Sequence, residues 1–133
     1  MKLSIYEFKD LTRSYGIIEF ENDEYKKLIS HIIKFKEKLK EILENKLGVF
    51  KCFKYAGGLM IYDEKQYPMT YISFETRENS IFTFEIYPNS MSAESNTNAK
   101  ELLDVIYLVT EILIGETLRK PKGMMLGFTL SWS

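Results

Sequence analysis

Hydrophobic residues recur at helical spacing in two long stretches of this chain. Over residues 23–46 they follow an i, i+3, i+4, i+7 pattern that ends at Gly48, which is typical of an amphipathic helix. Over residues 99–118 they surround nearly the whole helix, and Asn98 precedes Glu101 by the three residues of a capping box. We therefore expect two long helices, the second of them central or at an interface.

The stretch between these helices is rich in aromatic and β-branched residues and is divided by turn signals. Gly57-Gly58 separates two apolar runs and predicts a two-residue hairpin. We expect an antiparallel meander whose four strands cover residues 49–56, 59–64, 69–76 and 80–87. Both faces of this sheet would carry apolar side chains, so the second face needs a cover: a helix, another subunit or a partner.

The remaining segments give shorter patterns. Ser4 and Glu7 stand at capping-box spacing and predict a short helix over residues 4–14, with an N-terminal strand as the rival interpretation. Residues 88–98 are polar and predict a loop, whereas residues 124–132 alternate strictly between apolar and polar and predict a strand. Together the patterns predict a single α+β domain over residues 1–133, in which an antiparallel meander sheet of about four strands plus a C-terminal strand packs with two long helices and a short N-terminal helix.

Charge is sorted along the sequence. Residues 62–118 carry three Lys or Arg against ten Asp or Glu, a net of −7, whereas residues 1–61 and 119–133 each carry a net of +3. An acidic segment laced with tyrosines can recruit a basic partner, because tyrosine offers a large rigid contact area with a polar tip. The sequence predicts a partner-binding surface of Tyr62, Asp63, Glu64, Tyr67, Tyr71, Glu75, Glu78 and Glu85. Ordinary packing of these rings within the sheet is the alternative.

Residue types that carry catalysis or bind metals are scarce. His31 is the single histidine and Cys52 the single cysteine, so sites that need two imidazoles or several thiolates are excluded within one chain. We expect no enzyme activity, no metal and no cofactor; a hydrolase using Asp104, Glu111 and His31 is the least favoured reading. Few arginines, and lysines interleaved with glutamates on the first helix, argue against nucleic-acid binding.

The first residues lack the apolar core of an export signal, and no apolar stretch reaches the roughly 20 residues that span a bilayer. A single cysteine also fits a reducing compartment. We therefore expect a cytoplasmic protein that does not enter a membrane.

In size, single-domain α+β pattern and lack of catalytic motifs, the whole chain resembles the small bacterial immunity proteins that neutralise toxins. The resemblance lies in these general properties and not in a shared sequence motif, so it identifies no functional residue in this chain. It implies a non-catalytic inhibitor that masks the surface of a basic, nuclease-like toxin. The alternative is a small-ligand binding or sensor domain, with its ligand between helix and sheet and gated by residues 88–98. The apolar second helix also leaves a homodimer open.

Overall fold

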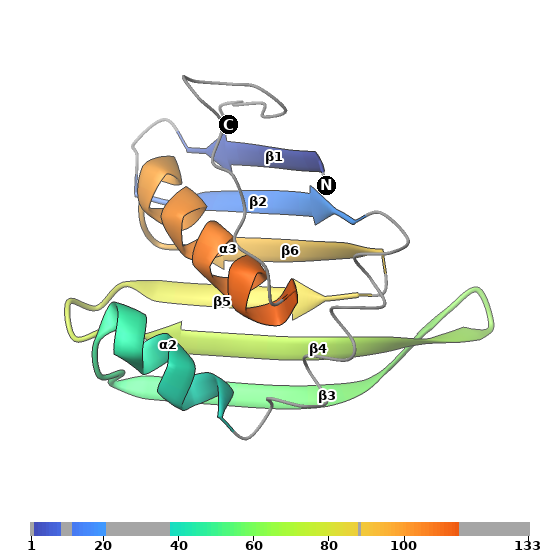
Figure 1. Ribbon diagram of the computed structural model, residues 1–133. Coiled ribbons are helices and arrows are strands. Elements are labelled where there is room, and N and C mark those ends of the chain that lie inside the picture. Colours follow the sequence, from blue (N-terminus) through green and yellow to red (C-terminus); the bar gives the residue numbers. More distant parts are fainter. Residues whose placement is uncertain (1, 9–11, 21–37, 88, 115–133) are drawn as a thin grey trace.

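The computed structural model describes residues 2–8, 12–20, 38–87 and 89–114 of the chain. In these residues six strands form one antiparallel sheet, and two helices pack on it (Figure 1). The elements are β1 (Lys2–Glu7), β2 (Ser14–Glu19), α2 (Leu39–Leu47), β3 (Cys52–Tyr62), β4 (Lys65–Glu75), β5 (Ile81–Ile86), β6 (Ser90–Ser95) and α3 (Ala99–Ile114). The order across the sheet is β1-β2-β6-β5-β4-β3, so the N-terminal hairpin joins the β3–β6 meander where β2 pairs with β6.

The strands form because their residues alternate between a buried and an outward face. In β1, Leu3 and Ile5 are buried, and in β5 the residues Phe82, Phe84 and Ile86 are buried. Buried residues stand opposite buried residues on the neighbouring strand: Leu3 is opposite Ile18, and Ile72 is opposite Phe84. The buried residues therefore form one apolar face of the sheet.

Both described helices lie on that face (Figure 1). In α3 the buried residues Leu102, Val105, Ile106 and Val109 follow helical spacing, and the helix contacts β1, β2 and β6. In α2 the buried residues are Leu39 and Leu43, which join the same core cluster. No helix within the described residues is long and apolar enough to cross a membrane.

The predicted helix content is wrong. The described residues form a six-stranded sheet with helices of 9 and 16 residues, not two long helices and a short one. The described part of residues 4–14 contains no helix: residues 2–7 are strand β1, as the rival interpretation held, because Leu3 and Ile5 are buried with strand periodicity against β2. The spacing of Ser4 and Glu7 fits a capping box only by coincidence.

One predicted turn and one predicted loop are also wrong. Gly57 and Gly58 lie inside β3 opposite Thr70 and Met69, and the hairpin turns instead at Asp63-Glu64, so one strand replaces two predicted ones. Residues 88–98 are not a single loop, because residues 90–95 form β6 in the middle of the sheet. Their serine-rich composition hides the alternation that buries Met91 and Ala93.

Three predicted segments reach beyond the described residues. Helix α2 covers the last part of the helix predicted over residues 23–46, and residues 23–37 lie outside the description. Helix α3 matches the helix predicted from residue 99 as far as Ile114, and residues 115–118 lie outside. The strand predicted over residues 124–132 lies wholly outside.

Candidate functional site

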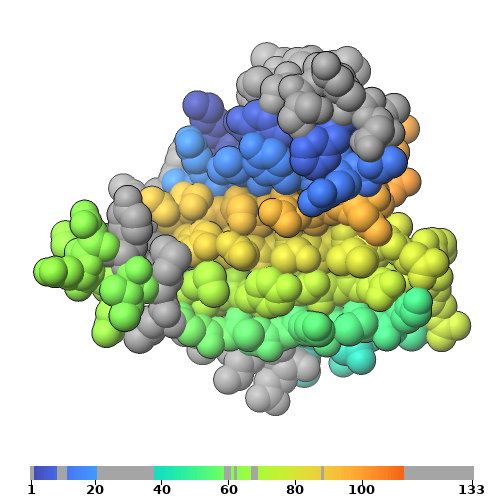
Figure 2. All heavy atoms as spheres, turned by 180° about the vertical axis from the view of Figure 1, so that it is seen from behind, coloured from blue at the N-terminus to red at the C-terminus, as the bar shows by residue number. Residues whose placement is uncertain are grey.

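The face of the sheet opposite α2 and α3 is the candidate site, and we name it the open face (Figure 2). None of the described residues forms a helix on this face. The alternate residues of the strands that define it include Tyr6, Tyr15, Ile17, Lys54, Tyr71, Ser73, Glu75, Ile81, Thr83, Glu85, Ser92 and Glu94. Hydroxyl, carboxylate and aromatic groups therefore dominate a broad surface.

The charges on the open face are unevenly placed. Its four glutamates stand on interior strands: Glu19 on β2, Glu94 on β6, Glu85 on β5 and Glu75 on β4. In β2, β5, β6 and the part of β4 that pairs with β5, no lysine or arginine faces this side. Lysines occur toward the edges of the described sheet, with Lys2 on β1 opposite Glu19 and Lys54 on β3, and at one end of it, where Lys65 begins β4.

Glu85 lies near the middle of the open face with neutral neighbours. Its cross-strand partners are Tyr71 on β4 and Ser92 on β6. The Tyr87 hydroxyl donates a hydrogen bond of 2.7 Å to Glu85 Oε2, and no described cation forms an ion pair with that carboxylate. This hydrogen bond stabilises the neutral phenol and, with some burial and the charge of Glu85, raises the pKa of Tyr87.

Apolar side chains are also exposed on the open face. Of the five large hydrophobic residues that are exposed among the described ones, three lie here: Tyr15 and Ile17 at 38% and Ile81 at 41% exposure. Tyr15 stacks on Tyr6 across β1 and β2, with ring centroids 4.6 Å apart and planes inclined by 16°. Scattered exposed hydrophobics are ordinary, but several on one face, beside carboxylates, have the composition of a contact surface.

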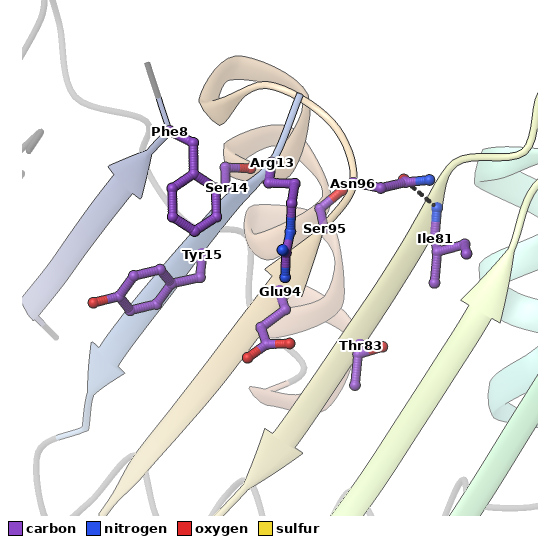
Figure 3. A pocket seen from close by; sticks show the side chains of 9 residues that line it. All are labelled: Phe8, Arg13, Ser14, Tyr15, Ile81, Thr83, Glu94, Ser95 and Asn96. Atoms are coloured by element: carbon purple, nitrogen blue, oxygen red, sulfur yellow. Dashed lines mark hydrogen bonds between the residues drawn. The ribbon is translucent and has the colours of Figure 1, made fainter. Parts of the chain in front are cut away.

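A hollow of about 210 Å³ lies at one end of the open face, where the β1–β2 hairpin meets β5 and β6 (Figure 3). Its lining includes Phe8, Arg13, Tyr15, Ile81 and Glu94. The guanidinium carbon of Arg13 lies 5.2 Å from the centroid of the Phe8 ring, a cation–π contact. The hollow thus combines aromatic, aliphatic and oppositely charged groups.

The structure brings together three of the eight residues predicted to bind a partner. Tyr71, Glu75 and Glu85 all face the open side, and Tyr71 stands directly opposite Glu85. Glu75 differs from Glu85 because Lys51 Nζ lies 3.7 Å from its Oε1. These three form the predicted part of the site.

The other five predicted residues lie away from this group. Asp63 and Glu64 form the turn between β3 and β4, and Glu78 is exposed in the turn between β4 and β5, at the other end of β4. Tyr62 and Tyr67 occupy positions in β3 and β4 opposite Lys65 and Met60, and their side chains lie outside the description.

Sequence reasoning missed the part of the open face built by β1, β2 and β6. Tyr6, Tyr15 and Ile17 fell in or beside the wrongly predicted N-terminal helix, and Glu94 fell in the wrongly predicted loop. A usable signal was present, because Ser90, Ser92 and Glu94 alternate with Met91 and Ala93.

The described residues contain no group of three or more His, Cys, Asp or Glu side chains that could hold a metal ion. Asp104 is exposed and Glu111 half-buried on α3, in the layer opposite the open face, and His31 lies outside the description. The described residues therefore do not assemble the three groups of the hydrolase reading.

No protein-family model matches this chain, and no curated protein or solved structure matches it at a significant level.

Proposed function

We propose that this chain is a non-catalytic binding protein whose open face receives a basic protein partner. The observation that carries the proposal is the charge layout of that face: its four glutamates stand on interior strands, and Glu85 near the middle has no lysine or arginine opposite it on either neighbouring strand. A carboxylate without a cationic neighbour, such as that of Glu85, attracts a Lys or Arg side chain and steers a basic partner toward the surface.

Tyr71 and Glu85 form the centre of the proposed contact. They stand opposite each other on β4 and β5, and both are half-buried. Burial of an aromatic ring supplies most of the affinity in such surfaces, whereas an exposed ion pair alone contributes little. A partner Lys or Arg that lies across Tyr71 and pairs with Glu85 would gain from both effects.

The finer proposal is that the partner is a nuclease-like toxin whose basic surface is masked in the cytoplasm. The sign of the charge on the open face and the resemblance in format to small bacterial immunity proteins support it. The small-ligand alternative has less support, because the loop that would gate its site over residues 88–98 contains strand β6.

The test is a binding measurement with the product of the adjacent gene, expressed separately and titrated against the full chain by calorimetry. We expect a basic protein that binds, and we expect Tyr71→Ala and Glu85→Gln each to weaken binding at least tenfold. Glu41→Gln is the matched control, since it removes the same charge from an exposed position on α2, in the other layer.

Two outcomes would overturn the proposal. One is an adjacent product that is acidic or does not bind. The other is equal affinity for wild type, Glu85→Gln and Tyr71→Ala, which would place the contact elsewhere. Salt dependence gives a further check, because attraction to the glutamates of the open face must weaken as ionic strength rises.

A further inference from the structure

The hollow at the end of the open face has walls whose polar groups are already engaged. Asn96 Oδ1 accepts a hydrogen bond of 2.7 Å from the Ile81 amide (Figure 3). Asn96 Nδ2 donates one of 2.9 Å to the Asn79 carbonyl. The Ser95 hydroxyl lies 2.6 Å from the Thr97 hydroxyl, and the Thr83 hydroxyl lies 3.2 Å from that of Ser73. These bonds hold the walls of the hollow in place.

Two charged side chains of the lining, unlike the polar groups just described, form no hydrogen bond or ion pair with each other. Arg13, the residue before β2, and Glu94 of β6 both line the hollow. Neither forms an ion pair with the other or with any other described residue, and Arg13 rests on the Phe8 ring instead. A guanidinium and a carboxylate therefore face the same small space without neutralising each other (Figure 3).

This arrangement selects the charge of a ligand. A purely cationic group would be attracted by Glu94 and repelled by Arg13, and a purely anionic group would meet the reverse. A ligand with both charges satisfies both residues, because guanidinium binds carboxylate through parallel hydrogen bonds and a carboxylate accepts from ammonium. Phe8 and Ile81 add apolar groups on opposite sides of the hollow, and Ile81 is 41% exposed (Figure 3).

The size of the hollow limits the ligand to about one amino-acid residue. Its volume of about 210 Å³ is below the range of roughly 300–1,000 Å³ typical of pockets for drug-sized molecules. We propose that the hollow binds a free α-amino acid with an aliphatic side chain, whose carboxylate pairs with Arg13 and whose ammonium pairs with Glu94. This site goes beyond the proposed protein partner and does not depend on it.

L-leucine is the probe, titrated into the full isotope-labelled chain while amide chemical shifts are recorded. Because the hollow is open to solvent, we expect saturable binding in the millimolar range, with shifts centred on Arg13 and Glu94. Two analogues of leucine test the contribution of each charged group to binding: 4-methylpentanoate lacks the ammonium group, and 3-methylbutylamine lacks the carboxylate. Each analogue should bind at least tenfold more weakly than leucine.

Arg13→Gln and Glu94→Gln should each weaken leucine binding at least tenfold. Both residues are exposed, so both variants should fold, and their melting temperatures check this. Arg77→Gln and Glu78→Gln are matched controls on an exposed turn and should bind as wild type does. Glu85→Gln, which tests the protein partner, should also leave leucine binding unchanged, so the two proposals can fail separately.

The proposal is overturned by any of three results. The first is no saturable shift with L-leucine up to about 50 mM, a concentration well above a millimolar dissociation constant. The second is binding of either analogue as tight as that of leucine. The third is wild-type affinity in both Arg13→Gln and Glu94→Gln.

Discussion

The backbone amide of Ala99 donates a hydrogen bond of 2.5 Å to the Glu7 carboxylate. The contact joins the end of β1 to the first residue of α3, and Asn98 Oδ1 accepts a second bond, of 2.9 Å, from the Glu101 amide. The first turn of a helix leaves its amides without helical partners, and negative charge there also favours the helix dipole. Glu7 and Asn98 thus stabilise the N-terminus of α3 from two directions.

Removal of the Glu7 carboxylate should destabilise the fold. We expect Glu7→Ala to lower the free energy of unfolding by about 1 kcal/mol, measured by urea denaturation, since loss of a capping group costs this much. Glu7→Gln should cost less, because its amide oxygen still accepts the bond. Glu78→Ala, at an exposed turn, is the control. An equal loss in Glu7→Ala and Glu78→Ala would contradict the capping role.

Gly16 allows α3 to approach the sheet closely. A Cβ atom at this position would lie 2.9 Å from Ile106 Cδ1, and Ile106 is only 1% exposed, so the side chain has little room to move away. We expect Gly16→Ala to lower the free energy of unfolding by about 1–3 kcal/mol through overpacking.

A double-mutant cycle tests this cause. Ile106→Val removes the Cδ1 atom and should cost about 0.5–1.5 kcal/mol alone. In combination with Gly16→Ala the total loss should be smaller than the sum of the two single losses, as thermal or urea unfolding can measure. Strict additivity would mean that the Gly16→Ala penalty does not arise from this contact.

The turn between β3 and β4 uses two residues that are poorly suited to it. Asp63 and Glu64 have φ angles of 54° and 62°, in the left-handed region that costs a side chain about 1–2 kcal/mol. Replacement by Asn-Gly should raise the free energy of unfolding by about 1 kcal/mol. Gly57→Ala with Gly58→Ala is the contrast, and should be neutral or stabilising, because the strand is extended there and nothing lies within 4 Å of an added Cβ. A large loss in that variant would place the turn at the glycines after all.

The same two sites explain why part of the fold escaped sequence reasoning. A Gly-Gly pair is a strong local turn signal, yet Gly57 and Gly58 pair with Thr70 and Met69 in a hairpin whose two strands have 11 residues each. The pairing of β2 with β6 joins segments far apart in the sequence, since Gly16 stands opposite Ala93. Local patterns cannot reveal such pairing.

Sequence patterns gave correct predictions where the residues that interact are close together in the sequence. The cap predicted from Asn98 and Glu101 is confirmed by the hydrogen bond between them, since both residues belong to one helix end. At the site, Tyr71 and Glu85 both belong to the acidic, tyrosine-bearing segment that the sequence predicts as the contact surface, and they stand opposite each other on β4 and β5. Glu94 and Arg13 were missed because their hollow needs β2 beside β6.

Thr110 carries a buried hydroxyl without a hydrogen-bond partner among the described residues. A buried polar group left unpaired costs about 1–3 kcal/mol, so its replacement by an apolar group of equal shape should be favourable. We expect Thr110→Val to raise the free energy of unfolding by about 1 kcal/mol, measured by urea denaturation. Thr110→Ser keeps the hydroxyl and should not stabilise. Destabilisation by valine would reveal a hydrogen bond that the fold depends on.

Tyr87 should make the protein sensitive to alkaline pH. Its hydrogen bond to Glu85 raises its pKa above the ordinary value of about 10, so the folded chain holds this proton more tightly than the unfolded chain does. The resulting stabilisation is complete below pH 10 and is lost as the pH rises through the folded pKa. Phenolate absorbance is titrated against pH in the wild type and in Tyr87→Phe, and the difference between the two curves reports Tyr87. The midpoint of this difference curve should lie above pH 10, and Glu85→Ala should lower that midpoint. A Tyr87 midpoint at or below 10 in the wild type would contradict this, because the hydrogen bond would then not favour the neutral phenol.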